Sequence, residues 1–482
     1  MSKYLNLSIK EIHELLKKGE ITPSILVNEC LEKIENSDLN SFITVDREGA
    51  LKKALELDKM PVPDDLLFGI PIAIKDNIMV KDLKCTCASR MLDNFTSIYD
   101  AGCIDEVRSH NMIIVGKTNM DEFAMGSTSE TSFYGAPLNP WNKSKVTGGS
   151  SGGSASCVAG GLVPLSLGSD TGGSVRQPSS FCGIVGMKPT YGRVSRYGLV
   201  SFASSLDQIG PMTRNVYENA LLLNVIAKSD NRDLTSIKTD EDFTRKIGEP
   251  LDNFKVAIPS YFISDVVDSE IKEKVLEIKK MLEENNIQVD IVDIKYIDKT
   301  VTLYQIIAMG EASSNLARFD GVRYGYSYPN PESLDDLYSK TRRFGFGNEV
   351  KRRIMVGSYL LSGENAKIYY NKALQIRDDL KKGFQKVFSE YNLIIGPTTA
   401  RCAYDLGSNG DDPIKSFMDD ILVMNANMGG FPSLSMPIGF NSNHLPIGLQ
   451  IIGNLCDEAT IYGLASFIEK RITDDFSEVR HD

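Results

Sequence analysis

The stretch Thr147–Arg176, TGGSSGGSASCVAGGLVPLSLGSDTGGSVR, contains two glycine-serine turns separated by a run of small apolar residues. The first turn covers 148–154 and the second covers 168–174. Thirteen of the 39 glycines in the chain fall between positions 148 and 198. Because glycine has no Cβ and adopts positive φ without strain, such turns let the backbone bend sharply or approach a ligand closely. The stretch therefore predicts a region that presents its side chains to a substrate.

Core elements flank both turns. We predict a packed helix over 155–161 and a buried strand over 162–167 between the turns. Upstream, FGIPIAIKDN at 68–77 is typical of an apolar strand that ends at Lys75, and 112–117 of another short strand. A lysine directly after a buried strand either loses its solvation, which lowers its pKa and lets it act as a base, or extends to solvent. Both readings stay open at this point.

The rest of the chain alternates strand-like and helix-like segments. Helices are expected from Ile9 to Gly19 and from Pro23 past Ile34. Further along, the expected elements are a strand at 255–258, a helix at 269–284, a strand at 287–294, a helix at 364–391 and strands at 393–395 and 446–453. This alternation without a linker predicts one α/β domain over residues 1–482, with a helical segment at 1–60 packed on it.

Composition limits the function classes. The net charge of −11 over 482 residues argues against a broad nucleic-acid-binding face, which needs clustered Lys and Arg. No apolar run approaches the length of about 18 residues that crosses a bilayer. The eight cysteines are scattered and no export signal precedes them, so we expect reduced thiols in the cytoplasm. Cys85 and Cys87 form the only close pair, and no second pair or nearby histidine completes a metal site.

Two familiar chemistries of glycine-rich turns fit this sequence poorly. A phosphate-binding loop of the Walker type ends in Gly-Lys-Ser/Thr, and neither turn contains that lysine; the dinucleotide pattern GxGxxG is absent as well. A Ser-His-Asp triad needs an imidazole, and of the four histidines only His110 is a loose candidate.

A serine nucleophile with a lysine base remains. Lys75 ends its strand, the first turn holds Ser150 and Ser151, and the second turn ends in Ser174. Ser-Lys pairs replace Ser-His pairs when the amine loses its solvation. The backbone N–H groups of Thr171, Gly172 and Gly173 are then candidates for an oxyanion hole. The alternative interpretation of GGSSGGS is a flexible loop.

The motifs GIPIAIKDN, TGGSSGGSA and GSDTGGSVRQPSSFCG together closely resemble the amidase signature family. The resemblance implies a Ser-cis-Ser-Lys triad with Ser174 as nucleophile, Ser150 as the bridging serine and Lys75 as the base. It also implies an α/β fold in which a twisted mixed sheet is flanked by helices. Neither a metal nor a cofactor is expected on this chain.

Three longer stretches, at 198–211, 311–324 and 345–355, resemble one branch of the family. Its members release ammonia from glutamine as the glutaminase subunits of tRNA-dependent amidotransferases, which convert Glu-tRNA(Gln) to Gln-tRNA(Gln) or Asp-tRNA(Asn) to Asn-tRNA(Asn). The resemblance implies that Tyr304, Arg353 and Asp420 hold glutamine.

The same resemblance implies a heterotrimer. A tRNA-activating B subunit would hold the misacylated tRNA, ATP and Mg²⁺, and a small C subunit would brace the pair. The chain departs from the residues usual in this branch at Gln305, Phe344, Arg401 and Asn425. The alternative function is a stand-alone amidase that acts on another carboxamide.

Overall fold

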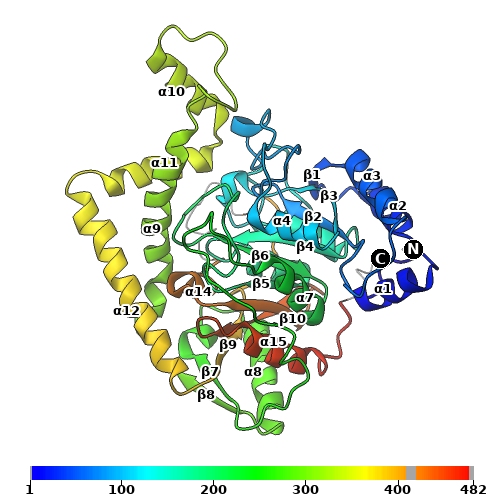
Figure 1. Cartoon of the computed structure of the whole chain (residues 1–482). Coiled ribbons are helices and arrows are strands. Elements are labelled where there is room, and N and C mark those ends of the chain that lie inside the picture. Colours follow the sequence, from blue (N-terminus) through cyan, green and yellow to red (C-terminus); the bar gives the residue numbers. More distant parts are fainter. Residues whose placement is uncertain (1–2, 409–418, 477–482) are drawn as a thin grey trace.

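A mixed β-sheet runs through the centre of the computed structural model, which describes residues 3–408 and 419–476 (Figure 1). In these residues the sheet has eleven strands in the order β1-β3-β2-β4-β6-β5-β10-β11-β9-β7-β8. The strands are β1 (Phe42–Val45), β2 (Pro71–Lys75), β3 (Ile113–Thr118), β4 (Leu165–Asp170), β5 (Val185–Lys188), β6 (Gln208–Thr213), β7 (Lys255–Pro259), β8 (Gln288–Val292), β9 (Leu393–Pro397), β10 (Ser433–Phe440) and β11 (Pro446–Gly453). Strand β2 is parallel to β3 and β4, whereas β6 is antiparallel to β4 and β5. The predicted mixed α/β sheet is thus confirmed.

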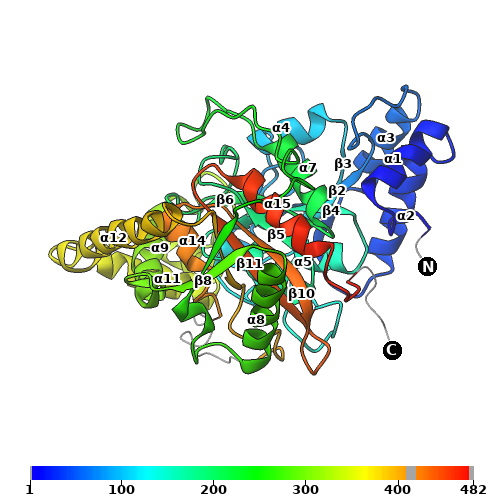
Figure 2. The same ribbon diagram turned by 90° about the horizontal axis from the view of Figure 1, so that it is seen from below.

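Helices surround this sheet. They are α1 (Ile9–Lys18), α2 (Pro23–Glu35), α3 (Arg47–Leu57), α4 (Gly102–Ser109), α5 (Gly152–Ala159), α6 (Arg176–Cys182), α7 (Val216–Ile226), α8 (Ser269–Glu284), α9 (Thr300–Asn315), α10 (Leu334–Gly345), α11 (Asn348–Leu361), α12 (Asn371–Phe388), α14 (Met424–Gly429) and α15 (Glu458–Glu469). Figures 1 and 2 show α1, α2 and α3 at one end of the molecule and α9, α11 and α12 at the other. None of the helices in the described residues is long and apolar enough to cross a membrane.

Local sequence signals explain where the first helices begin and end. Ser8 and Glu11 form the predicted capping box at the start of α1, and Gly19 closes that helix with φ of 70°. Thr22 caps α2, which has Pro23 in its first turn. Within the segment 1–60, β1 pairs with β3, so this segment contributes a strand to the sheet as well as three helices.

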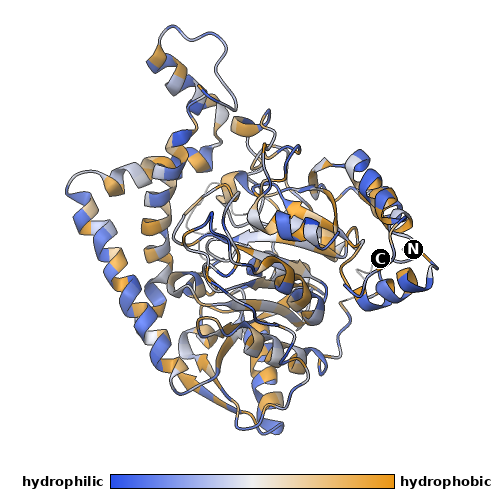
Figure 3. Cartoon of the chain, in the orientation of Figure 1, coloured by the Kyte–Doolittle hydropathy of each residue, from blue (hydrophilic) through white to orange (hydrophobic). Residues whose placement is uncertain are grey.

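The central strands are buried on both faces. Every residue of β2, β3 and β4 is buried, and Figure 3 shows long hydrophilic stretches along α12 at the edge of the molecule. A strand that is covered on both faces favours a continuous apolar run, as PIAI at 71–74 in β2 shows. The sheet therefore provides a rigid base for the residues that follow β2 and β4.

Some element bounds differ from the sequence-based expectation. Strand β4 covers Leu165–Asp170 instead of 162–167, because Gly168, Ser169 and Asp170 continue the pairing with β6. Helix α5 begins at Gly152, three residues before the expected start. The expected helix 364–391 is α12 (Asn371–Phe388), preceded by a π-helical turn at Ala366–Tyr370. The second glycine turn is accordingly shorter than predicted and begins only after Asp170.

Candidate active site

The two glycine-serine turns meet at one edge of the sheet. Strands β2 and β4 are parallel neighbours, so their carboxyl ends, Lys75 and Asp170, lie at the same edge. The first turn leads into α5 and the second into α6. In open α/β sheets this edge is the usual place for ligands, because the loops that leave the strands converge there.

Lys75 lies at the centre of this site. Its side chain is fully buried, and its Nζ donates to the hydroxyl oxygens of Ser150 and Ser151, both at 2.8 Å, and to the carbonyl oxygen of Ser169 at 3.2 Å. Burial lowers the pKa of Lys75 to about 7, and the nearby carboxylates, with Asp121 foremost, only partly oppose this effect. The amine is therefore close to half neutral near pH 7.

The two serines beside Lys75 are not equivalent. Ser151 Oγ also donates to the Ser169 carbonyl at 3.1 Å and accepts from the Ser169 N–H at 3.3 Å. In the described part of the chain, the hydrogen bond from Lys75 is the only one that Ser150 Oγ makes. The peptide bond between Gly149 and Ser150 is cis. Ser150 is thus the hydroxyl that retains capacity for a further partner.

Ser174 lies next to this pair. The Ser151 N–H donates to the Ser174 carbonyl at 3.2 Å, which joins the two turns directly. The Ser174 residue is 8% exposed, the largest value among Lys75, Ser150 and Ser174. Its hydroxyl makes no hydrogen bond to residues 3–408 or 419–476. The structure therefore brings all three predicted residues together and leaves the Ser174 hydroxyl available.

An ion pair between Asp170 and Arg176 holds the second turn. Arg176 Nε donates to Asp170 Oδ2 at 3.1 Å, and the Gly173 and Val175 N–H groups donate to the same carboxylate at 2.8 and 3.2 Å. Asn427 donates to Asp170 Oδ1 at 2.8 Å. Burial by itself would raise the pKa of Asp170, but the Arg176 guanidinium outweighs it and holds that pKa well below its usual range. Both ends of the turn are thereby fixed by a charged group.

The three predicted oxyanion donors are not equally available to a ligand. The N–H of Gly173 already donates to Asp170, so it supports the turn. The N–H groups of Thr171, Gly172 and Ser174 make no hydrogen bond within the described residues. Gly173 has φ of 123°, and a Cβ there would lie 2.3 Å from Val423. The turn thus needs glycine at 173 and leaves three neighbouring N–H groups for a ligand.

Two of the three predicted glutamine-binding residues, Tyr304 and Asp420, lie against this turn, while Arg353 lies near Tyr304 and its Nε donates to Glu349 Oε1 at 2.6 Å. A Cβ on Gly172 would lie 2.6 Å from the ring of Tyr304, and a Cβ on Gly173 would lie 3.2 Å from Asp420 Oδ1. Burial raises the pKa of the Tyr304 hydroxyl, and the positive charge of Arg353 opposes that rise. Tyr304 comes from α9 and Arg353 from α11, and both side chains are buried.

Asp420 is an incompletely satisfied carboxylate. Its Oδ2 accepts from Ser127 Oγ at 2.6 Å, whereas its buried Oδ1 has no hydrogen-bond partner in the described residues. Burial raises the pKa of Asp420 well above its ordinary value. A buried acceptor without a donor costs free energy, so Oδ1 is suited to accept a hydrogen bond from a ligand.

Sequence analysis missed several supporting residues. Gln177 accepts the Gly149 N–H at 2.8 Å and donates to the Ser127 carbonyl at 2.9 Å, and so connects the first turn to the loop before it. Opposite charges at Asp170 and Arg176, on either side of the second turn, were a usable signal for the ion pair. Gln177 gave no such signal because its partners are distant in the sequence.

No group of three or more His, Cys, Asp or Glu side chains in the described residues is arranged to hold a metal ion. Cys85 and Cys87 are buried free thiols.

Known proteins are similar to this chain over most of its length. The profile of the family described as Amidase matches residues 25–462. The A subunit of the glutamyl-tRNA(Gln) amidotransferase of Pediococcus pentosaceus is 48% identical over 471 residues, which is 97% of each chain. That of Streptococcus gordonii is 50% identical over 466 residues, which is 96% of this chain and 95% of the relative.

Solved structures agree with the sequence comparisons. The crystal structure of the glutamyl-tRNA(Gln) amidotransferase A subunit from Thermotoga maritima has a TM-score of 0.82 and 38% sequence identity, and the match covers 98% of this chain and 97% of that one. A bacterial aryl acylamidase of the amidase signature family has a TM-score of 0.87 at 23% identity over 98% of both chains, which shows a shared fold.

Proposed function

The chain belongs to the amidase family, and we propose that it hydrolyses the side-chain amide of glutamine as the glutaminase subunit of a tRNA-dependent amidotransferase. The observation that carries the chemistry is the 2.8 Å contact between the buried Lys75 Nζ and Ser150 Oγ, next to Ser174. The match to a glutamyl-tRNA(Gln) amidotransferase A subunit over 97% of both chains supports the choice of amide.

In the proposed mechanism, Lys75 acts as the base through Ser150. Neutral Lys75 takes a proton from Ser150 Oγ while Ser150 takes one from Ser174, and Ser174 Oγ bonds to the amide carbon of glutamine. The carbonyl oxygen becomes an oxyanion, for which the free N–H groups of Thr171, Gly172 and Ser174 are the donors that we propose. We assign Gly173 to holding the turn, since its N–H is bound to Asp170.

The second half of the reaction reverses the proton path. The proton returns from Lys75 through Ser150 to the leaving nitrogen, the carbon–nitrogen bond breaks, and ammonia departs. A water molecule, deprotonated by the same relay, then attacks the γ-glutamyl ester on Ser174 and releases glutamate. A lysine with a pKa of about 7 suits both directions, because it accepts and returns a proton at little cost near neutral pH.

We propose that Arg353 and Asp420 hold the two charged groups of glutamine. Arg353 offers a planar fork to the α-carboxylate, and Asp420 Oδ1 accepts from the α-ammonium. A bound ammonium group would satisfy this oxygen and keep Asp420 ionised. Tyr304 packs over Gly172 and limits the width of the site there.

The ammonia would serve a second reaction on a partner. We propose a cytoplasmic heterotrimer in which the tRNA-activating B subunit holds ATP, Mg²⁺ and the misacylated tRNA and the small C subunit braces the pair. The net charge of −11 fits a chain that does not itself bind tRNA broadly. Gln-tRNA(Gln) is the product that the names of the relatives indicate.

The test compares two nitrogen donors in the reconstituted complex. With Ser174→Ala, amidation of Glu-tRNA(Gln) should fail with glutamine and persist with ammonium chloride, because only glutamine hydrolysis needs Ser174. Loss of amidation with both donors would contradict this assignment of Ser174. Hydrolysis of other carboxamides by the lone chain, with no activity on glutamine in either setting, would favour a stand-alone amidase.

A further inference from the structure

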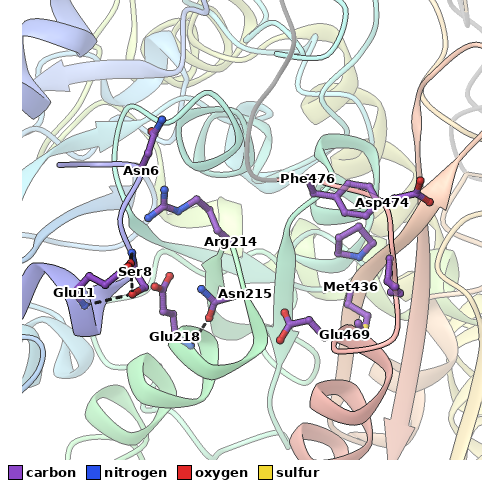
Figure 4. A pocket seen from close by; sticks show the side chains of 12 residues that line it. Asn6, Ser8, Glu11, Arg214, Asn215, Glu218, Met436, Glu469, Asp474 and Phe476 are labelled. Carbon is purple, nitrogen blue, oxygen red and sulfur yellow. Dashed lines mark hydrogen bonds between the residues drawn. The ribbon is translucent and has the colours of Figure 1, made fainter. Parts of the chain in front are cut away.

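A second cavity lies away from the Ser-Lys site. It has a volume of about 400 Å³ and lies between the start of α1, the start of α7, strand β10 and the segment that follows α15 (Figure 4). Lys75, Ser150, Ser174 and the proposed glutamine-binding residues do not line it. Any ligand of this cavity would therefore be distinct from glutamine in the active site.

The lining of this cavity is acidic. Four carboxylates line it, from Glu11, Glu218, Glu469 and Asp474, against the single guanidinium of Arg214. Arg214 donates to the Leu7 carbonyl at 2.8 Å and forms no ion pair within 4.0 Å in the described residues. Burial raises the pKa of Glu469 to about 7, so part of this negative charge is neutralised near neutral pH. The carboxyl groups still outnumber the one guanidinium, which disfavours an anionic ligand and favours a cation.

Glu218 gives a second, independent observation that points to a ligand. Its residue is only 2% exposed, and its Oε1 accepts the Ile9 N–H at 2.9 Å. Its Oε2 is buried and has no hydrogen-bond partner in the described residues. Burial raises the pKa of Glu218, and the charge of Arg214 opposes that rise without donating a hydrogen bond to this oxygen. A buried carboxylate oxygen without a donor costs free energy, so a positively charged donor would stabilise it.

The apolar residues that line the rest of the cavity indicate which class of cation fits it. Met436 and Pro437 of β10, together with Ile472 and Phe476, give the cavity an apolar side. No cluster of three metal-ligating side chains exists in the described residues, so a bare metal ion lacks ligands here. An apolar wall facing a carboxylate pair suits a cation with a short aliphatic body.

We propose that this cavity binds an alkylammonium group, with its positive charge between the carboxylates of Glu218 and Glu469 and its aliphatic part against Met436 and Phe476. Two sources carry this chemistry, a free aliphatic amine and a lysine side chain of an associated protein chain. Glu469 already accepts the Val216 N–H at 2.8 Å, so it is positioned at the end of α7 that faces the cavity.

The probe is n-butylammonium chloride, which has the same charge and length as a lysine side chain. Isothermal calorimetry on the full chain should show saturable binding, and n-butanol, which has the same length and no charge, should not bind. Glu218→Gln keeps an acceptor for the Ile9 N–H but removes the charge, and should weaken binding about ten-fold or more. Glu14→Gln, on the exposed face of α1, is the matched control and should bind as the wild type does.

Repeating the titration with the assembled complex separates the two sources. Binding to both the lone chain and the complex indicates a free amine. Binding to the lone chain alone, with weaker assembly of the Glu218→Gln variant, indicates a lysine of the associated protein chain. Absence of saturable binding to both the lone chain and the complex would overturn the proposal, as would equal affinity in the Glu218→Gln variant or equal binding of n-butanol.

Discussion

Replacing Lys75 with methionine is expected to abolish glutamine hydrolysis and yet to stabilise the protein at low pH. The folded lysine titrates at about 7 and the unfolded one at its ordinary 10.5. Between these values the unfolded chain binds more protons than the folded chain, so wild-type stability rises with pH by about 1.4 kcal/mol per pH unit. Below about pH 7 Lys75 is protonated in both states, so the free energy of unfolding is lowered by the full cost of burying the charged amine.

The size of the effect follows from these values. Burying a protonated Lys75 costs about 5 kcal/mol relative to the unfolded state below pH 7. Lys75 also donates three hydrogen bonds, which contribute about 1 kcal/mol each and are lost in the variant. Lys75→Met should therefore be about 2 kcal/mol more stable than wild type near pH 6, and about 1 kcal/mol less stable near pH 9.

Urea unfolding of both proteins across this pH range measures the difference. Lys188→Met is the matched control, because Lys188 is also fully buried and burial lowers its pKa to about 7. Both variants should change the pH dependence of stability, but only Lys75→Met should remove glutaminase activity. A difference between Lys75→Met and wild type that stays constant with pH, or that favours wild type at low pH, would refute a lysine with a lowered pKa.

Three further substitutions test the surroundings of the turn. Arg353→Lys keeps the charge but loses the planar fork, so KM for glutamine should rise about ten-fold with little change in kcat, and an unchanged KM would remove Arg353 from the site. Gly172→Ala places a methyl group 2.6 Å from the ring of Tyr304. We expect kcat/KM to fall about ten-fold or more while circular dichroism stays the same; full activity would show that the turn has room for a side chain. Glu122→Gln alters the buried carboxylate that accepts the Gly347 N–H at 2.9 Å, at the start of the helix that carries Arg353. Burial raises the pKa of Glu122 to about 7, so this contact is strongest above pH 7 and weakens as pH falls. Wild-type KM for glutamine should rise on acidification, and the rise should be smaller in the variant, in which only Asp420 still titrates; identical KM profiles would contradict the link.

Local patterns in the sequence predicted several elements at their observed bounds. Helix α8 (Ser269–Glu284) and strand β11 (Pro446–Gly453) coincide with the expected ranges, since a charged amphipathic run and an apolar run between turn residues are local signals. Lys75 was singled out because it ends an apolar strand, and its Nζ lies 2.8 Å from Ser150 Oγ. Position at a strand end made Lys75 a candidate, and the serine-rich turns and the family resemblance favoured its role as a base.

Contacts between distant segments could not be predicted in this way. Asn427 donates to Asp170 at 2.8 Å across 257 residues, and nothing in either local sequence indicates the partner. The sheet order, in which β10 inserts beside β5, depends on such long-range pairing as well. The hydrogen bond from the Gly173 N–H to Asp170, which removes this N–H from the predicted oxyanion hole, could also be found only from the structure. A glycine-rich turn has several N–H groups, and the sequence does not show which of them are already bound.

The most direct test of the proposed mechanism is to trap the covalent intermediate. The complex is mixed with glutamine, quenched in acid within milliseconds and digested, and the peptide that contains Ser174 is analysed by mass spectrometry. The mechanism predicts a γ-glutamyl ester on Ser174 that is absent from Ser174→Ala. An adduct on Ser150 or Ser151, or ammonia release by Ser174→Ala at the wild-type rate, would contradict Ser174 as the nucleophile.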